Sequence, residues 1–270
     1  MDTTPYRIAL GEPVRLGDRP TEVDGGRSKD ELDDLHEANI EALDELQERL
    51  FAEGKQSLLV VLQAMDAGGK DSTIGKVFGP LNPQGVRVWS FKKPTEKELA
   101  HDFLWRVHKQ APGHGTIGVF NRSHYEDVLI VRVHGWASPE IIERRYDHIR
   151  HFEEMLRDGG TTVVKIMLNI SKDYQAERFR RRLRRPDKHW KFNPADLDER
   201  EHWDDYMRCF EIAMERTSTE AAPWYVVPAE NRDFRDALVS QIVRDHLEAM
   251  DPQYPEPEFD PADFPPESVV

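Results

Sequence analysis

The chain has 270 residues, of which 38% are hydrophobic and 33% charged, and its formal net charge is −14 at pH 7. This length suits one large domain, or one domain with additions, and the negative charge argues against a general binder of nucleic acid or anionic membranes. The single cysteine, Cys209, excludes an internal disulfide framework. Apolar runs are too short to cross a membrane and residues 1–5 lack a signal-peptide pattern, so a cytoplasmic protein is expected.

The two ends of the chain differ in composition from its middle. Residues 1–28 are rich in Pro, Gly and charge, and they are expected to form an extended arm. Apolar residues then recur at helical spacing, which predicts an amphipathic helix over 29–53, with Ser28 and Glu31 forming a capping box. Residues 251–270 carry six prolines, six acidic residues and no Lys or Arg, which is typical of a solvated acidic tail.

Between these ends, short apolar runs alternate with helical patterns. The apolar runs predict strands at 58–62, 86–89, 117–120, 163–168 and 224–227. The helical patterns lie at 70–78, 96–109, 139–157, 172–182, 198–217 and 233–250. Continuous apolar strands separated by helices predict an α/β fold with a parallel central sheet covered on both faces. Ligands of such folds bind at the carboxyl ends of the strands.

The most informative stretch is 60–73, with the sequence VVLQAMDAGGKDST, which leads from an apolar strand through a glycine turn into a helix. Backbone N–H groups and the helix dipole favour an anion at such a junction, and Lys70 can reach a terminal phosphate. The usual phosphate-loop pattern is G-x-x-x-x-G-K-[ST]; here Ala64 replaces the first glycine and Asp71 replaces the Ser or Thr. A phosphorylated ligand is predicted, the alternative being a plain glycine turn with a solvated Lys70.

A second polar cluster follows the strand predicted at 117–120. Arg122 can neutralise a phosphate bidentately, and the carboxylates of Glu126 and Asp127 come soon after it. Enzymes that use nucleoside triphosphates often carry a magnesium-binding carboxylate at such a strand end, where this chain has Asn121. The alternative is a helix start in which Asn121 or Ser123 is the N-cap and Glu126, three residues after Ser123, completes a capping box.

A third cluster is strongly basic, with eight Lys or Arg residues and one acidic residue between positions 178 and 192. Pro186 interrupts the helix there, so a mobile basic loop after a helix is predicted, as in the lids of phosphoryl-transfer enzymes. A solvated helix face or an RNA contact is the alternative. Lys92 follows a strand end and can contact phosphate, and Lys165 lies within a strand where it can pair with a carboxylate.

Taken together, these segments resemble the polyphosphate kinase 2 family over roughly residues 30–250. The resemblance rests on residues 62–71 (LQAMDAGGKD), 82–86 (NPQGV), 91–95 (FKKPT), 120–127 (FNRSHYED) and 190–197 (WKFNPADL). It implies a three-layer α/β/α phosphate-loop kinase fold with a parallel central sheet and a helical lid at about 178–197. The kinase domain would then span 29–250, between an arm at 1–28 and a tail at 251–270.

The resemblance also implies an activity, which is the magnesium-dependent movement of a phosphoryl group between inorganic polyphosphate and nucleotides. Asn121 and Glu126 stand where other subgroups usually have Asp and Asn, which resembles the class III subgroup that uses both AMP and ADP. Gly68 and Ser72 stand where the family often has alanine and glycine, and we expect the loop shape to survive both exchanges.

Roles for individual residues follow from the same resemblance. Asp66 and Glu126 would hold Mg²⁺, or Mn²⁺ in its place. The expected catalytic residues are Asp66, Lys70, Arg122 and Arg178. The expected phosphate-binding or substrate-binding residues are Ala67, Gly68, Gly69, Asp71, Ser72, Thr73, Lys92, Asn121, Glu126, Arg182 and Lys188.

Two other readings of the sequence stay open. One is a phosphate-loop kinase that takes ATP as donor and a nucleoside or nucleoside monophosphate as acceptor. The other is an RNA-binding regulator that uses the arginine segment, against which the net charge stands. The expected partners are inorganic polyphosphate and adenine nucleotides, with no nucleic acid and no membrane, and a homo-oligomer is expected.

Overall fold

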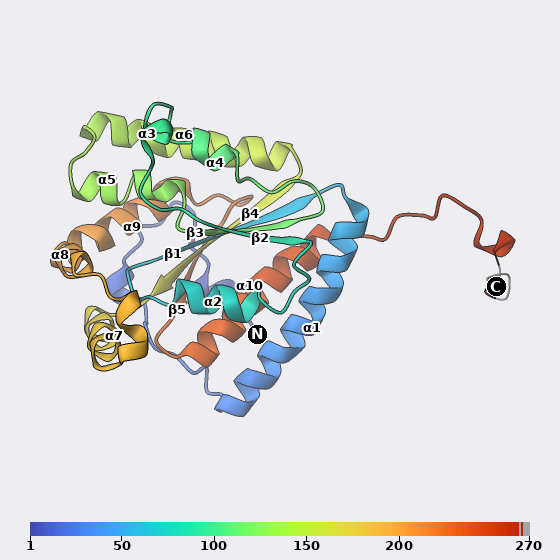
Figure 1. Ribbon diagram of the computed structural model, residues 1–270, viewed down its shortest axis with the longest axis horizontal. Coiled ribbons are helices and arrows are strands. Elements are labelled where there is room, and N and C mark those ends of the chain that lie inside the picture. The colour runs from blue at the N-terminus through green and yellow to red at the C-terminus, as the bar shows by residue number, and fades with distance from the viewer. Residues whose placement is uncertain (265, 267–270) are drawn as a thin grey trace.

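A five-stranded parallel sheet forms the centre of the computed structural model, which describes residues 1–264 and 266 (Figure 1). The strand order is β2-β3-β1-β4-β5, and all the pairings are parallel. The strands are β1 (Ser57–Ala64), β2 (Val86–Ser90), β3 (Ile117–Asn121), β4 (Thr161–Asn169) and β5 (Trp224–Pro228). Each contains the apolar run that predicted it, and β1 is buried along its whole length because it lies at the middle of the sheet.

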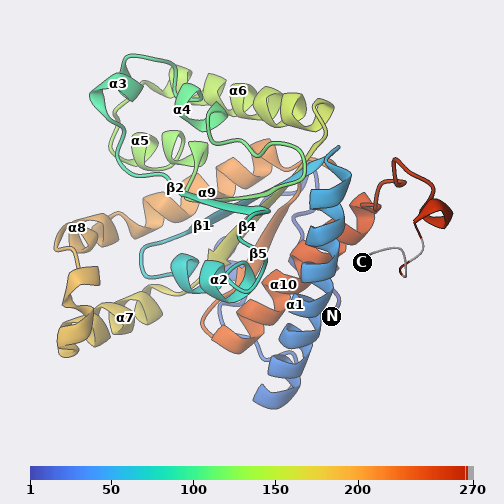
Figure 2. The same ribbon diagram turned by 45° about the vertical axis from the view of Figure 1, so that its right-hand side comes forward.

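Helices cover both faces of the sheet, so the three-layer α/β/α prediction is confirmed (Figures 1 and 2). The helices α1, α2 and α10 lie on one face, and α6 and α9 lie on the other with the short helices α3, α4 and α5. Their bounds are α1 Lys29–Glu53, α2 Lys70–Val77, α3 Glu96–Leu99, α4 Trp105–His108, α5 Ile130–Val133, α6 Pro139–Asp158, α7 Lys172–Arg184, α8 Ala195–Glu201, α9 Trp203–Thr217 and α10 Arg232–Met250.

The register of the strands brings the candidate site residues to one edge of the sheet. Leu62 of β1 is the partner of Asn121 of β3, and Ala64 of β1 is the partner of Leu168 of β4. The segments that follow β1, β3 and β4 therefore leave the sheet side by side at its carboxyl edge. Helices α7 and α8 lie beyond this same edge, at the left in both ribbon views (Figures 1 and 2).

The ends of the first helix are as the sequence predicts. The side chain of Ser28 accepts from the Glu31 amide at 3.3 Å, and the Glu31 carboxylate accepts from the Ser28 amide at 2.7 Å. Helix α1 ends at Gly54, whose left-handed φ of 63° favours glycine. Local chemistry alone sets both ends of this helix.

Two predicted helices prove to be pairs of shorter ones. The stretch 96–109 is divided into α3 and α4 because the Asp102 side chain accepts from the Leu104 amide at 3.0 Å, which makes a turn. The stretch 198–217 is interrupted at His202, and α8 starts three residues earlier than predicted, at Ala195. The segment after Pro186 is a 3₁₀ helix, Pro186–Lys191, where a loop was predicted.

The two ends of the chain behave differently. Within the arm, Ile8, Val14 and Leu16 are buried, and Arg7 forms an isolated antiparallel bridge with Tyr225 of β5. After α10, Pro252 is still buried and the Gln253 N–H donates to Oε1 of Glu53 at 3.4 Å, and the chain then extends away from the body of the molecule (Figures 1 and 2). Positions 265 and 267–270 of the predicted tail lie outside the described residues. Among the described helices, none has both the length and the apolar character needed to span a membrane. The proposed domain boundaries remain predictions.

Candidate active site

The glycine turn between β1 and α2 forms a cradle at the carboxyl edge of the sheet. Ala67 and Gly69 both have left-handed φ angles, of 64° and 99°. The backbone conformation favours glycine at position 69, and a Cβ atom there would lie 2.5 Å from Nη1 of Arg235 and would displace that side chain. Arg235 of α10 also donates to Oγ of Ser72 at 3.0 Å, which ties the first turn of α2 to the opposite end of the chain.

Lys70, the first residue of α2, turns back over the loop. Its Nζ donates to the Ala64 carbonyl at 2.8 Å, at the end of β1. Burial lowers the pKa of Lys70 to about 8, and the neighbouring Arg122 acts in the same direction, while Asp66 opposes them. A phosphate bound next to this amine would favour its charged form and so oppose the effect of burial on the pKa of Lys70.

Arg122 lies directly after β3 and faces the loop. Its Nη2 donates to Oδ1 of Asp66 at 2.6 Å, and its backbone has a left-handed φ of 60°. Glu126, and after it Asp66, raise the pKa of the Arg122 guanidinium, so it stays charged. The adjacent Asn121 donates to Oδ1 of Asp71 at 2.7 Å, which joins the end of β3 to the start of α2.

The segment after Arg122 is not the capping box that was the alternative reading. Ser123 does act as an N-cap, because its hydroxyl accepts from the Tyr125 amide at 3.1 Å at the start of a 3₁₀ turn, His124–Asp127. Glu126 does not complete a box; its side chain lines a pocket that also contains Asp66 and Arg122. The carboxylate is therefore placed at the site and not at a helix end.

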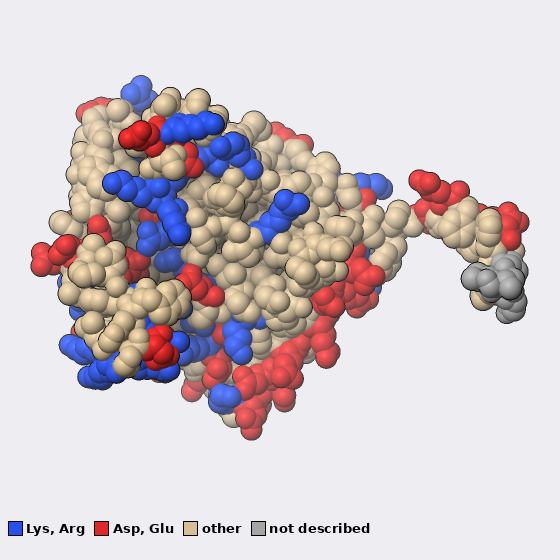
Figure 3. All heavy atoms as spheres, in the orientation of Figure 1, with Lys and Arg blue, Asp and Glu red and all other residues tan. Residues whose placement is uncertain are grey.

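A groove of about 790 Å³ joins the phosphate loop to the basic segment of the chain. The loop and the end of β3 form one wall, and side chains of α7 and of Pro186–Lys191 form the other. Lys and Arg side chains gather over α7 at the lower left of Figure 3, whereas acidic side chains gather along α1. The phosphate loop and the basic segment therefore line one groove, although the chain as a whole is acidic.

A smaller pocket of about 220 Å³ opens beside the groove and shares Asp66, Arg122, Asn193 and Asp196 with it. Its apolar wall comes from Leu129, Ile130 and Phe210, and its polar wall from Glu126, Glu199 and Tyr206.

Neighbouring groups hold the carboxylate of Glu199 in place and raise the pKa of Asp196, and both residues line this pocket. The Tyr206 hydroxyl donates to Oε2 of Glu199 at 2.6 Å, and Nε2 of His134 lies 3.0 Å from the same carboxylate. Burial, with the nearby charge of Asp66, raises the pKa of Asp196 to about 6. Asp196 thus lines both cavities, and the negative charge of Asp66 together with burial disfavours the ionised form of its carboxyl group.

Almost all the predicted site residues line one or other cavity. The groove contains Asp66, Ala67, Gly68, Gly69, Lys70, Asp71, Ser72, Lys92, Asn121, Arg122, Arg178, Arg182 and Lys188. Glu126 lines the smaller pocket. Thr73 is the exception: it is fully buried, its N–H donates to the Gly69 carbonyl, and it lines neither cavity, so its contact with a ligand stays a prediction.

Several residues that line the groove were not predicted from the sequence. Arg181 lies three residues after Arg178 in α7, a spacing that places both on one face of a helix, and Arg185 directly follows the end of this helix. Arg232 starts α10 just after β5, so the rule that ligands bind at the carboxyl edge of a parallel sheet could have identified it. No comparable local signal marks the apolar wall of the smaller pocket.

The oxygen donors at the junction suit a hard divalent cation. Asp66 and Glu126 both line the smaller pocket, and carboxylates are the side chains that Mg²⁺ prefers. Within residues 1–264 and 266, no group of three or more His, Cys, Asp or Glu side chains could by itself hold a metal ion. A cation bound through one or two carboxylates and substrate phosphates fits this donor set.

A parallel sheet, a glycine–lysine turn that opens a helix at its carboxyl edge, and a basic lid across a shared groove define a phosphate-loop kinase. Residues 26–255 match the family model described as polyphosphate kinase 2. The chain belongs to the polyphosphate kinase 2 family and is a polyphosphate:nucleotide phosphotransferase. Membership of a kinase family indicates a requirement for a divalent metal.

Relatives over most of the chain support this assignment. An AMP/ADP-polyphosphate phosphotransferase from Meiothermus ruber is 56% identical over 216 residues, which cover 80% of this chain and 81% of the relative. An ADP-polyphosphate phosphotransferase from Rhodopseudomonas palustris is 44% identical over 271 residues, covering 94% and 92%. The crystal structure of polyphosphate kinase 2 from Arthrobacter aurescens TC1 gives a TM-score of 0.92 at 47% identity, over 96% of this chain and 93% of that one.

Proposed function

We propose that this enzyme transfers a phosphoryl group reversibly from inorganic polyphosphate to AMP and to ADP. The observation that carries the proposal is the junction of two cavities at Asp66, Arg122 and Asp196. The larger cavity suits a long polyanion, and the smaller one suits a nucleoside monophosphate or diphosphate. Donor and acceptor would then meet where the loop and the lid face each other.

The basic groove is the proposed polyphosphate site. Its cationic side chains come from the loop, from the end of β2 and from the lid, whereas the whole chain carries a net charge of −14. A positive surface confined to one groove would attract a polyanion there, whereas the acidic surface elsewhere would repel it. Lys92 and Lys93 extend the positive lining beyond the phosphate loop, so that several successive phosphates could be bound.

The smaller pocket is the proposed acceptor site. Its apolar wall of Leu129, Ile130 and Phe210 can pack against a base or a ribose. Arg122 lies at its junction with the groove, where the acceptor phosphate would need a positive charge. The relative from Meiothermus ruber, 56% identical, is named for both AMP and ADP, which supports the use of both acceptors.

Chemistry at the junction needs only positioning and charge stabilisation. The bond from the terminal phosphorus to its bridging oxygen breaks as that phosphorus joins an oxygen of the acceptor phosphate, with no covalent enzyme intermediate. Lys70, the loop N–H groups and Arg122 would neutralise the phosphoryl oxygens. Asp66 and Glu126 would hold Mg²⁺, which supplies positive charge to those oxygens and orients them.

Product analysis with separate acceptors tests this proposal. The enzyme is incubated with polyphosphate and magnesium, without ATP, and with AMP, ADP or GDP as the only nucleotide. ADP followed by ATP from AMP, and ATP from ADP, are expected, and GDP would report base preference. Product formation from AMP only when ATP is added would instead support the ATP-dependent nucleotide kinase that the sequence left open.

We also propose that the enzyme works as a homo-oligomer without a nucleic-acid or membrane partner. The net charge of −14 supports the second part, because nucleic acids and anionic membranes would be repelled outside the groove. Light scattering coupled to size exclusion measures the first part. A mass of 31.4 kDa, that of one chain, would contradict it.

A further inference from the structure

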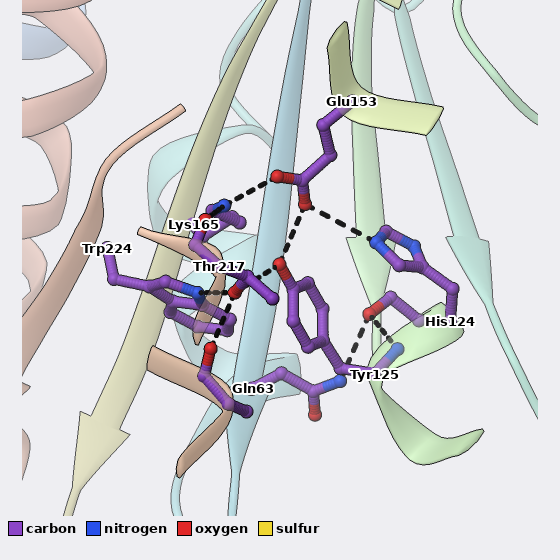
Figure 4. A network of polar contacts seen from close by, with 9 residues as sticks. Gln63, His124, Tyr125, Glu153, Lys165, Thr217 and Trp224 are labelled. Atoms are coloured by element: carbon purple, nitrogen blue, oxygen red, sulfur yellow. Dashed lines mark hydrogen bonds and ion pairs between the residues drawn. The ribbon is translucent and has the colours of Figure 1, made fainter. Parts of the chain in front are cut away.

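A charged pair is buried between strand β4 and helix α6 (Figure 4). Lys165, in the middle of β4, and Glu153 of α6 are 0% and 3% exposed, and Nζ of Lys165 lies 2.6 Å from Oε2 of Glu153. Nζ also donates to the Thr217 carbonyl at 2.7 Å. Burying two charges costs about as much as their attraction returns, so stability alone explains such a pair poorly.

The second oxygen of Glu153 faces the segment that follows Arg122. The hydroxyl of Tyr125 donates to Oε1 of Glu153 at 2.8 Å, and Nε2 of His124 lies 3.5 Å from it (Figure 4). Although burial opposes it, Lys165, together with His124, holds the pKa of Glu153 below its usual value, so the acceptor for Tyr125 is a carboxylate. The buried pair is therefore hydrogen-bonded to the active-site segment itself.

The segment held in this way has a strained backbone. Arg122 has a left-handed φ of 60°, a conformation that a residue with a side chain adopts only when its surroundings impose it. Gln63 of β1 restrains the segment from the other side: with its amide oriented to suit both neighbours, its nitrogen donates to Oε1 of Glu126 at 3.0 Å and its oxygen accepts from the Ser123 amide at 3.3 Å.

We propose that Tyr125, Glu153 and Lys165 are positioning residues, which hold Arg122 and Glu126 in the geometry needed for phosphoryl transfer. None of the three lines either cavity, so they act through the segment and not on the substrate. The buried charge supplies a strong, directional acceptor for the Tyr125 hydroxyl. This inference rests on the proposed roles of Arg122 and Glu126.

The sharpest test is Tyr125→Phe, which removes one hydroxyl and keeps the ring. We expect kcat to fall about tenfold while KM for AMP and for polyphosphate stays within about twofold, because loss of positioning weakens the reacting geometry more than binding. Tyr225→Phe is the matched control, because the Tyr225 hydroxyl is also partly buried and hydrogen-bonded. It lies 3.1 Å from Nε2 of His246 in α10, away from the segment that follows Arg122. Its kcat should equal that of the wild type.

A second variant removes the charges without leaving either one unpaired. Glu153→Met/Lys165→Met keeps the volume and should stay folded with a melting temperature near that of the wild type, yet lose about tenfold in kcat. Adding Tyr125→Phe to it should cause little further loss, because all three residues act on one segment, whereas independent effects would multiply.

Two results would overturn the inference. One is a kcat for Tyr125→Phe within about twofold of the wild type at a temperature where both are folded by circular dichroism. The other is a double methionine variant that melts earlier but keeps its kcat, which is what a purely structural role produces. Failure of the proposed function would be recognised separately, because the wild-type enzyme would then form no product from AMP and polyphosphate. In that case kcat of the variants would be compared in the reaction that the wild-type enzyme does catalyse.

Discussion

Arg122 and Asp66 are 56 residues apart in the chain, and the guanidinium of one donates to the carboxylate of the other at 2.6 Å. They meet because β3 and β1 are neighbours in the sheet, with Asn121 in register with Leu62. In the proposed reaction both groups would exchange this contact for ligands, with Arg122 turning to a phosphate and Asp66 to the metal. The ion pair therefore keeps the two charges at the junction of the cavities before substrates bind.

Removing the lysine of the phosphate loop should abolish most turnover. For Lys70→Ala we expect kcat to fall at least about 100-fold, because a positive charge aimed at the transferring oxygens is lost. The melting temperature should not fall, since the lost ammonium group is itself buried at a cost. The control is Lys76→Ala, which removes an exposed lysine from the same helix, α2. Near-normal kcat for Lys70→Ala would refute its role.

Asp66→Ala tests the proposed metal ligand. We expect kcat to fall at least about 100-fold and the magnesium concentration for half-maximal rate to rise, because one of two carboxylate ligands is gone. Asp44→Ala, which changes an exposed carboxylate on α1, is the control. An unchanged magnesium dependence in Asp66→Ala would assign the residue a role other than metal binding.

The lid should make polyphosphate binding depend on salt. Arg181→Gln/Arg185→Gln removes two charges from the groove, and we expect about tenfold weaker polyphosphate binding with a salt dependence that is less steep by about 1 to 2 in log–log slope.

Two other arginines of α7 offer a control with an equal change in charge. Arg180 and Arg184 lie outside the groove beside Glu177, so Arg180→Gln/Arg184→Gln should leave both quantities close to those of the wild type. Titrations at several salt concentrations measure the affinity. Equal effects of the two double variants would mean that net charge, and not the groove, attracts the polyanion.

The pH dependence should report the titration of Lys70. Burial lowers its pKa to about 8, so the ammonium group is charged below that pH and loses its proton as the pH rises through it. We therefore expect kcat/KM for polyphosphate to fall by up to about tenfold per pH unit above pH 8, since kcat/KM reports groups of the free enzyme. Measurements between pH 6.5 and 9.5 at constant ionic strength decide it, and a flat profile would contradict this assignment.

Filling the smaller pocket should affect the acceptor and not the donor. Ile130→Trp adds bulk to its apolar wall, and we expect KM for AMP to rise about tenfold or more while KM for polyphosphate changes by less than about twofold. The same substitution at the exposed Ile141 of α6 is the control. A rise in KM for polyphosphate alone would exchange the roles proposed for the two cavities.

Local patterns determined much of this protein in advance. The five strands, the capping box of Ser28 and Glu31, and the glycine–lysine turn all depend on residues close together in the chain. Hydrophobic period, side-chain capping and backbone conformation act over a few residues, so they can be read directly from the sequence. The parallel order of strands and helices then placed the loop and the segment after β3 at the same edge of the sheet.

The tertiary structure alone decided which distant groups meet. Glu153 as the partner of Lys165, Phe210 on the wall of the acceptor pocket, and Arg232 in the groove come from segments that no local pattern connects to the phosphate loop. The burial of Thr73 was likewise decided by the tertiary structure, because the loop pattern placed this residue beside the exposed Ser72. Such pairings depend on the rotation of each helix and on long-range packing, which the order of residues along the chain does not display.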